Sequence, residues 1–160
     1  MLLKTFVSIL VINGVLASGE KFFRRDYTYN AEYDAFYKLH WDDKSSTWEE
    51  AFLTCDDEGG KLFYPKHTEE WKVAANLSDS LVDVDNIFVG VRDEFGAGDF
   101  VSIEGAKIGL SEDERRQDED CKVIRLAQSS NNYDDDNNMK HIDTSCNLTL
   151  PFICEMKVKV

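Results

Sequence analysis

Four cysteines are the residues of this chain whose chemistry is easiest to read from their surroundings. Cys55 ends a run with helical spacing, and Cys121 opens a run typical of a strand. Cys146 and Cys154 stand near the end of the sequence. Cysteines of secreted proteins oxidise to disulfides. Because four cysteines allow three pairings, the residues alone predict two cross-links without saying which cysteines they join.

Carboxylates are the second group of side chains that could do chemistry. The chain has 31 Asp and Glu residues against 18 Lys and Arg residues, and its formal net charge is −13. Such a surface repels nucleic acid phosphates and anionic membranes, and it favours calcium, other cations or basic partners. A simpler interpretation is that the charge keeps the protein soluble in extracellular fluid. We expect no nucleic acid partner.

The histidines and carboxylates do not form the pattern of a catalytic site. His40, His67 and His141 lie in separate segments without the spacing of a zinc site. The sequence has no Gly-x-Ser-x-Gly motif and no phosphate-binding loop. Acidic pairs are too abundant for any one of them to indicate a glycosidase. The sequence therefore predicts that the protein is not an enzyme.

The elements that would position these residues follow an N-terminal secretion signal. Lys4 precedes an apolar stretch at residues 6–16, and small residues follow it. We therefore predict a signal peptide at residues 1–18, since the stretch is too short to span a bilayer. Residues 19–35 are charged and tyrosine-rich and are predicted to form an N-terminal arm. We expect a secreted, extracellular protein without a membrane span.

Two helices are predicted in the first half of the chain. Ser46 and Glu49 fit a capping box, and apolar residues at helical spacing follow in residues 48–55. Gly59 and Gly60 would end this helix. A second helix is predicted to begin near Thr68. Its apolar side would consist of Trp71, Ala74, Ala75 and Leu77.

Strands and two unusual loops make up the remainder. Residues 36–41 and 87–91 have the composition of strands, and residues 122–126 that of another. The polar residues 106–120 form a long loop, and long loops in compact domains are usually functional. Residues 128–138 are an acidic, low-complexity insertion. This insertion is either a solvated hairpin tip or a contributor to calcium or ligand binding, and it lacks the spacing of an EF-hand.

Residues 36–156 together resemble the C-type lectin-like domain, in particular its short, single-domain, secreted invertebrate type. The order of helix, central strand, four cysteines and the closing Phe-Ile-Cys-Glu at residues 152–155 carries the resemblance. It implies an α+β fold in which two helices flank small antiparallel sheets beside a long loop region. It also implies that the strand at residues 36–41 pairs with the C-terminal one. The implied disulfides are Cys55–Cys154 and Cys121–Cys146.

The resemblance also implies a position for calcium and sugar in the long loop. Calcium takes six to eight oxygen ligands, and sugar-binding members supply some from a Glu-Pro-Asn or Gln-Pro-Asp motif about ten residues before the cysteine that Cys121 matches. The matching positions here are Ser111, Glu112 and Asp113, or one residue later Glu112 to Glu114. Neither register contains the proline, whose cis bond orients the ligands in the family.

Two further ligand positions match more closely. Glu119 corresponds to the family's glutamate before the cysteine, and Asp143 to the aspartate of its Trp-Asn-Asp triplet. Ile142 replaces the asparagine and offers no oxygen. The implied metal ligands are Glu112, Asp113, Glu119 and Asp143. The implied ligand-binding residues are Ser111, Glu112, Asp113, Glu119, Ile142 and Asp143.

The leading functional prediction is a secreted lectin that binds microbial or host glycans in innate immune recognition. Calcium is the implied cofactor, and its requirement stays open because the proline motif is absent. The alternative is a calcium-independent module on the same fold that binds a protein or a surface without binding sugar. A structural or coat role is a third hypothesis. Two sequons predict N-glycosylation at Asn76 and Asn147.

Overall fold

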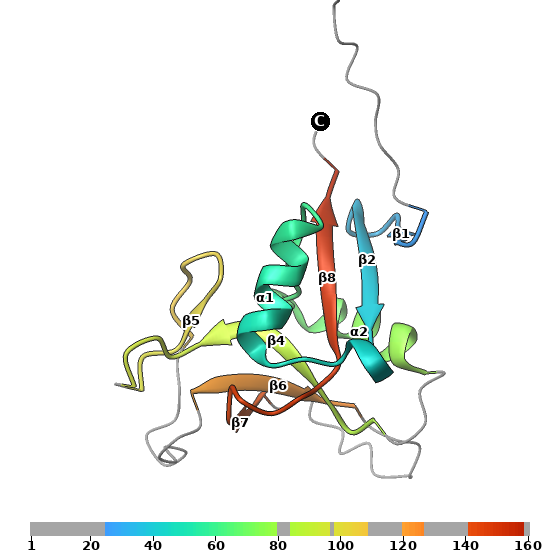
Figure 1. The fold of residues 1–160 in the computed structure, drawn as a ribbon. Coiled ribbons are helices and arrows are strands. Elements are labelled where there is room, and N and C mark those ends of the chain that lie inside the picture. Colours follow the sequence, from blue (N-terminus) through green and yellow to red (C-terminus); the bar gives the residue numbers. More distant parts are fainter. Residues whose placement is uncertain (1–24, 80–83, 97, 109–119, 127–140, 159–160) are drawn as a thin grey trace, which may run out of the picture.

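The computed structural model describes residues 25–79, 84–96, 98–108, 120–126 and 141–158 (Figure 1). The predicted signal peptide, residues 1–18, lies outside these ranges. The helices are α1 (Trp48–Asp57) and α2 (Trp71–Ser78), and the 3-10 turns are η1 (Asp42–Lys44) and η2 (Thr68–Glu70). The strands are β1 (Thr28–Asn30), β2 (Ala35–His40), β3 (Lys61–Leu62), β4 (Asn86–Arg92), β5 (Val101–Ser102), β6 (Cys121–Arg125), β7 (His141–Thr144) and β8 (Phe152–Lys157).

The strands are connected into one sheet. Its order is β1-β2-β8-β4-β6-β7, with β3 paired to β8 and β5 paired to β4. In Figure 1, α1 and α2 lie on opposite sides of the β2–β8 pair. The α+β class with two helices is therefore confirmed.

The long antiparallel pair β2–β8 joins the two ends of the domain, as predicted. Its register runs from Ala35 opposite Lys157 to His40 opposite Phe152. Part of the predicted N-terminal arm continues this sheet, because β1 pairs with β2. Tyr27, just before β1, is buried in the core.

The two antiparallel parts of the sheet, β1-β2-β8-β3 and β5-β4-β6-β7, are joined at one point. β4 pairs with β8 in parallel at Phe88 and Phe152, which joins the two halves into one mixed sheet. The amide of Phe88 donates to the carbonyl of Pro151 at 2.9 Å. Both phenylalanines are fully buried, so the sheet continues through the centre of the core, where apolar burial is most favourable.

The N-cap of helix α1 lies one residue later than predicted. Thr47 is the N-cap, and Glu50 completes the capping box in place of Ser46 and Glu49. Ser46 is instead paired with Leu150 in an isolated β-bridge, so its backbone is already engaged. The helix buries Trp48, Ala51 and Cys55 against the sheet.

Helix α2 follows the turn η2, so the α-helical part starts at Trp71, a few residues after the predicted start at Thr68. Its buried residues are Trp71, Val73, Ala74 and Ser78. Ala75, predicted on the apolar side, is exposed, and Val73 takes the inward position. No helix among the described residues is long and apolar enough to cross a membrane.

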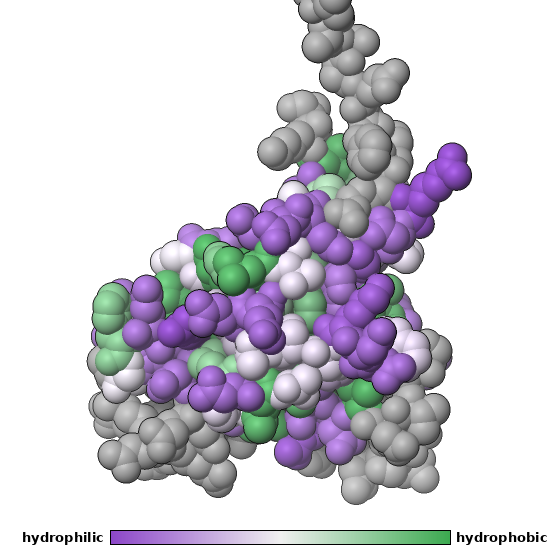
Figure 2. Space-filling view, viewed as in Figure 1, coloured by the Kyte–Doolittle hydropathy of each residue, from purple (hydrophilic) through white to green (hydrophobic). Residues whose placement is uncertain are grey.

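The two predicted disulfides are present. Cys55–Cys154 ties α1 to β8, and Cys121–Cys146 ties the start of β6 to the residues after β7. The first therefore fixes α1 on the long β2–β8 pair, and the second fixes the outer strand pair of the sheet. The face of the molecule in Figure 2 is largely hydrophilic, with a small apolar group over α1.

Candidate functional site

The candidate site is the outer strand pair of the sheet, formed by β6 and β7 and called here the β6–β7 edge. Of the residues predicted from the sequence, it contains Ile142 and Asp143. The other predicted ligands fall within residues 109–119 and lie outside the described residues, as does the insertion at residues 128–138. These outside ligands are Ser111, Glu112, Asp113 and Glu119.

Asp143 is bound to a lysine that the sequence-based ligand set does not include. Lys122 on β6 is the cross-strand partner of Asp143 on β7, and its ammonium forms an ion pair and hydrogen bond with the Asp143 carboxylate. The side chain of Lys122 is 1% exposed and that of Asp143 is 9% exposed. The ammonium also lies 4.2 Å from the centroid of the Phe100 ring. Both partners of this buried cation are therefore provided by the protein.

Ile142 points to the other face of the same strand pair. It is the partner of Val123 and packs against the core group that contains Trp48, Cys121 and Val123. Its side chain contributes apolar packing, which holds β7 on the core. It therefore adds no ligand oxygen beside Asp143.

The described part of the site does not fit calcium. Calcium needs six to eight oxygen ligands, with carboxylates prominent among them. Ile142 offers none from its side chain, and an oxygen of Asp143 is engaged by the Lys122 ammonium. A metal ion at Asp143 would have to displace that ammonium and leave it buried without a counter-charge.

Residues that flank the long loop are anchored on neighbouring strands. The amide of Ile108 donates to the Phe100 carbonyl at 2.9 Å, and the amide of Asp93 donates to the Asp120 carbonyl at 2.8 Å. The buried Asp93 carboxylate also accepts hydrogen bonds from the amides of Phe95 and Gly98. These bonds shape a tight turn after β4 in which Phe95 is 84% exposed.

Sequence reasoning missed both Lys122 and Phe95. A lysine within the apolar run Cys-Lys-Val-Ile was a usable signal, since a buried charge requires a partner. Asp143 could be identified as that partner only from the β6–β7 register. For Phe95, the position of a large apolar residue between Asp93 and two glycines was a usable signal of exposure.

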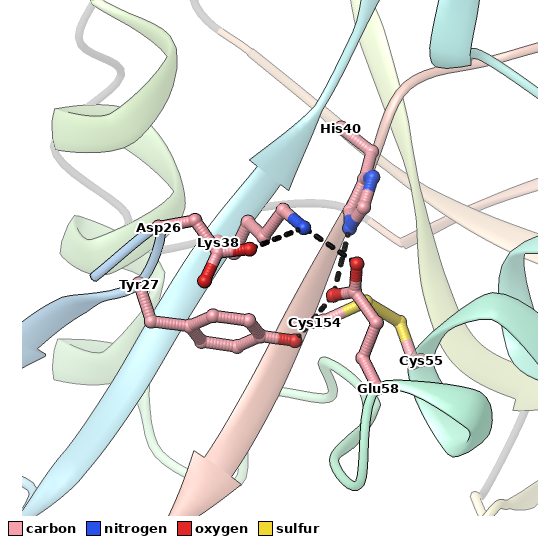
Figure 3. The surroundings of a disulfide bond; sticks show 7 residues. All are labelled: Asp26, Tyr27, Lys38, His40, Cys55, Glu58 and Cys154. Atoms are coloured by element: carbon pink, nitrogen blue, oxygen red, sulfur yellow. Dashed lines mark hydrogen bonds and ion pairs between the residues drawn. A yellow bond between two sulfur atoms is a disulfide. The ribbon is translucent and has the colours of Figure 1, made fainter. Parts of the chain in front are cut away.

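A second polar group surrounds the Cys55–Cys154 disulfide (Figure 3). Glu58 accepts hydrogen bonds from Tyr27 and Lys38, and its carboxylate lies 3.3 Å from the His40 Nε2 atom. His40, Glu58 and Cys154 lie close enough to share a metal ion. Cys154 is in a disulfide and has no thiolate to offer, so this group does not fit a metal site.

Electrostatics in this second group favour neutral His40 and ionised Glu58. Burial lowers the pKa of His40, although the nearby Glu58 carboxylate opposes the change. Burial raises the pKa of Glu58, but the hydrogen bonds from Lys38 and Tyr27 and the adjacent charges outweigh it, so the pKa is lowered. The group links the chain before β1 to the end of α1, which is a structural role.

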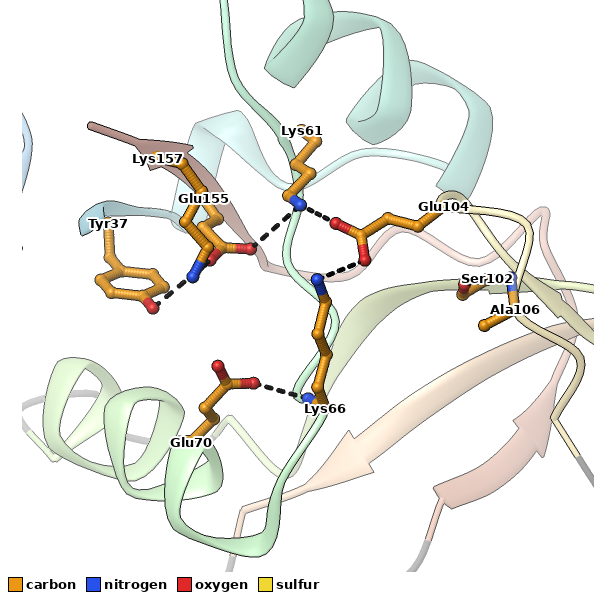
Figure 4. A network of polar contacts seen from close by, with 9 residues as sticks. All are labelled: Tyr37, Lys61, Lys66, Glu70, Ser102, Glu104, Ala106, Glu155 and Lys157. Atoms are coloured by element: carbon orange, nitrogen blue, oxygen red, sulfur yellow. Dashed lines mark hydrogen bonds and ion pairs between the residues drawn. The ribbon is translucent and has the colours of Figure 1, made fainter. Parts of the chain in front are cut away.

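A third polar group joins β3, β8 and the turn after β5 (Figure 4). Glu104 forms ion pairs with Lys61 and Lys66. The buried Glu155 lies near Lys61 at 3.8 Å and Lys157 at 2.6 Å. Each of these lysines forms an ion pair with one of the two carboxylates, so the contacts of the group are made within the protein and tie β3 to β8 and to the turn after β5.

Both predicted glycosylation positions are on the surface. Asn76 is exposed on α2, and the hydroxyl of its sequon residue Ser78 donates to the carbonyl of Ala74 at 2.6 Å. Asn147 is exposed after β7, and its sequon residue Thr149 is exposed as well. N-glycosylation at Asn76 and Asn147 stays a prediction.

Comparison with protein families gives one match over most of the chain. The model of the family described as "Lectin C-type domain" matches residues 44–156. This range contains both helices, all four cysteines and the β6–β7 edge.

A curated insect protein is similar to this chain. The "Hemolymph lipopolysaccharide-binding protein" of Periplaneta americana is 30% identical over 139 residues, which are 77% of this chain and 49% of that protein. The chain thus spans about half the length of this relative.

Solved structures show the same fold at lower identity. The C-type lectin domain of murine dendritic cell inhibitory receptor 2, in complex with N-glycan, has a TM-score of 0.62 and 15% identity, over 85% of this chain and 99% of that chain. A calcium-independent type II antifreeze protein has a TM-score of 0.61 and 15% identity, over 85% and 95% of the two chains. The fold thus occurs both in a glycan complex and in a protein that works without calcium.

Proposed function

The chain belongs to the C-type lectin domain family, and from that premise we propose that it is a secreted protein that binds the carbohydrate part of glycoconjugates. The ligand-binding surface is the β6–β7 edge together with the loop residues 106–120. Surface glycans of microbes are the favoured ligands, and recognition of them in body fluid is the physiological role. The protein binds its ligand and does not transform it, since this fold is typically a non-enzymatic binding domain.

The observation that carries this proposal is the rigid construction of the β6–β7 edge. Four consecutive residue pairs align β6 with β7, and the Cys121–Cys146 disulfide closes one end. The buried pair of Lys122 and Asp143 fixes the side chains that face the Phe100 side. Binding sites are most precise when rigid elements support them, and loops on such a support supply the variable contacts.

The relative from Periplaneta americana supports the choice of ligand. Its name states that it binds lipopolysaccharide, a glycoconjugate. The similarity extends over 77% of this chain, so it includes much of the domain rather than a short motif. Secretion is supported by the predicted signal at residues 1–18 and by two disulfides, which persist in oxidising compartments.

Retention on immobilised ligands tests the proposal. The secreted protein is passed over mannan, galactose, lipopolysaccharide and peptidoglycan supports, and retained protein is displaced with the matching soluble glycan. A double variant, Glu112→Ala with Asp113→Ala, should reduce retention. The control, Asp56→Ala with Asp57→Ala, removes the same charge from the exposed end of α1 and should not. Absence of retention on every support would contradict the proposal.

The exposed Phe95 favours a second candidate, a module that binds a protein or a surface without sugar. The aromatic side chain of Phe95 is 84% exposed next to amides that the Asp93 carboxylate holds, and it is a suitable anchor for a partner. Under this alternative, Phe95→Ser removes partner binding but leaves folding unchanged. Under the leading proposal, the Phe95→Ser variant should be retained on the glycan support as the wild-type protein is.

A further inference from the structure

The β6–β7 edge contains a positive charge of its own where calcium-dependent members of the family would hold a metal ion. Lys122 is almost completely buried, and it extends from β6 towards the carboxylate of Asp143 on β7. We propose that the Lys122 ammonium takes the place of calcium on Asp143, so that this edge is fully formed without a metal ion. The inference rests on the proposed function in one point, that the β6–β7 edge is part of the ligand-binding surface.

The surroundings of Lys122 show why the ammonium is fixed there. A buried charge is strongly unfavourable unless it is paired, and two groups stabilise this one. The carboxylate of Asp143 supplies the counter-charge, and the face of Phe100, with its centroid 4.2 Å away, supplies a cation–π contact. The neighbouring Cys121 is in a disulfide, so β6 cannot slide to release the lysine.

The same geometry excludes a divalent ion at this carboxylate. A calcium ion on Asp143 would stand next to the ammonium that contacts the same group, and two cations repel each other strongly at such separations in a protein interior. Moving the ammonium away would leave it buried without a partner. Ile142 packs on the opposite face of the strand pair, and its side chain has no oxygen that could bind calcium.

The fixed ammonium also replaces the ordering effect of a metal ion. In a calcium site, the cation draws carboxylates together and is itself lost when a chelator is added. Here the cation is covalently part of β6 and aligned with Asp143 by strand register. A chelator therefore cannot remove it, and the edge keeps its shape in EDTA.

The melting temperature (Tm) of the wild-type protein in millimolar calcium and in EDTA is the first test. If calcium bound with a Kd one hundred times lower than the calcium concentration used, it would raise the Tm of a domain this size by about 8 °C. We expect the same Tm in both conditions. A rise in calcium that Asp143→Asn abolishes would overturn the inference.

Substitution of Lys122 tests the cause. Lys122→Met keeps the length of the side chain, removes its charge and leaves the Asp143 carboxylate unpaired, so this variant should melt at a lower temperature than the wild type in EDTA. Lys122→Arg keeps the charge and should remain insensitive to calcium. The matched control, Lys72→Met, removes an exposed lysine of α2 and should leave the Tm unchanged in EDTA and in calcium.

The outcomes separate cleanly even if Lys122→Met fails to fold. In that case the wild-type and Lys122→Arg measurements decide, and a rise of the Tm in calcium that Asp143→Asn abolishes overturns the inference in either protein. A folded Lys122→Met that melts at the wild-type temperature in EDTA also overturns it, because the ammonium then does not stabilise the edge.

Retention on glycan supports in EDTA distinguishes this inference from the proposed function. Retention in EDTA supports both. Retention that requires calcium overturns the inference and leaves the proposed function intact. No retention on any support, with a Tm insensitive to calcium, contradicts the proposed function and supports the inference.

Discussion

His40 and Glu58 face each other beside the Cys55–Cys154 disulfide, with the imidazole Nε2 atom 3.3 Å from a carboxylate oxygen. The imidazole is buried and stacks on Phe152, and the two ring planes are inclined by only 6°. This contact joins the end of β2, the end of α1 and the start of β8. The protonation of one histidine therefore affects three elements of the core.

The first prediction concerns pH. Because burial lowers the pKa of folded His40, the unfolded chain binds a proton more readily, and stability should fall as the pH drops below about 6.5. The lowered pKa of Glu58 acts in the same direction in the more acidic range, below about 4.5. The urea midpoint measured across this range should decrease steadily towards acid. His40→Gln should flatten the upper part of the curve.

A matched control identifies His40 as the source of this dependence. His67 is exposed, so His67→Gln should leave the curve unchanged. If His40→Gln keeps the wild-type slope near neutral pH, the histidine is not responsible and the loss must come from carboxylates.

The second prediction compares the two disulfides. Cys55 and Cys154 are separated by 99 positions, and Cys121 and Cys146 by 25. In the chain-entropy model, closing the longer loop contributes about 4.7 kcal/mol and closing the shorter loop about 3.5 kcal/mol. Replacing each pair by alanines should lower the free energy of unfolding in that order, as measured by urea denaturation. An equal or reversed order would mean that native packing, rather than loop length, decides the difference.

Both pairings followed from the family resemblance because the cysteines occupy distinct settings, at a helix end, a strand start and the chain end. The N-cap of α1, by contrast, could not be predicted from the sequence. Ser46 with Glu49 and Thr47 with Glu50 satisfy the same pattern. The bridge between Ser46 and Leu150 decides between them, and it joins residues more than a hundred positions apart. Local sequence contains no information on that contact.

The third prediction concerns Gly90 at the centre of β4. A Cβ atom there would lie 2.7 Å from the Leu62 carbonyl oxygen and 3.0 Å from the side chain of Ile103. Gly90→Ala should therefore lower the free energy of unfolding by about 1–3 kcal/mol, as overpacking does. Wild-type stability in Gly90→Ala would show that β3 can move away.

A combined variant separates the two contacts of Gly90. Ile103→Ala removes the side-chain contact, but the Leu62 carbonyl belongs to the backbone and cannot retreat as easily. Gly90→Ala should thus remain destabilising in the Ile103→Ala background, by a smaller amount than in the wild type. Urea denaturation of the four proteins measures this difference.

The candidate site was only partly predictable for a similar reason. Asp143 follows from its distance to Cys146, which the family pattern fixes. Lys122 lies 21 positions away, and the residues between them give no sign of the strand register. The pairing depends on how β6 and β7 align, and a shift by one residue would turn Lys122 to the opposite face.

The fourth prediction is the coupling energy between Lys122 and Asp143. Removing one member of a buried ion pair leaves the other charge without compensation and costs about 3–5 kcal/mol, so Lys122→Met and Asp143→Leu should each be strongly destabilising. The double variant should recover much of that loss, because apolar residues can replace a buried pair with little cost. Urea denaturation of the four proteins in EDTA gives the coupling energy.

The pair formed by Lys61 and Glu104 is the control for this coupling. Its side chains are 29% and 30% exposed, so solvent screens the attraction and the coupling should not exceed about 1 kcal/mol. A coupling between Lys122 and Asp143 no larger than this would mean that water reaches the pair. Water at the pair would also let a metal ion compete for Asp143, since the displaced ammonium would then be solvated. If the Lys122 ammonium takes the place of calcium, the coupling energy between Lys122 and Asp143 should therefore be large and that between Lys61 and Glu104 small.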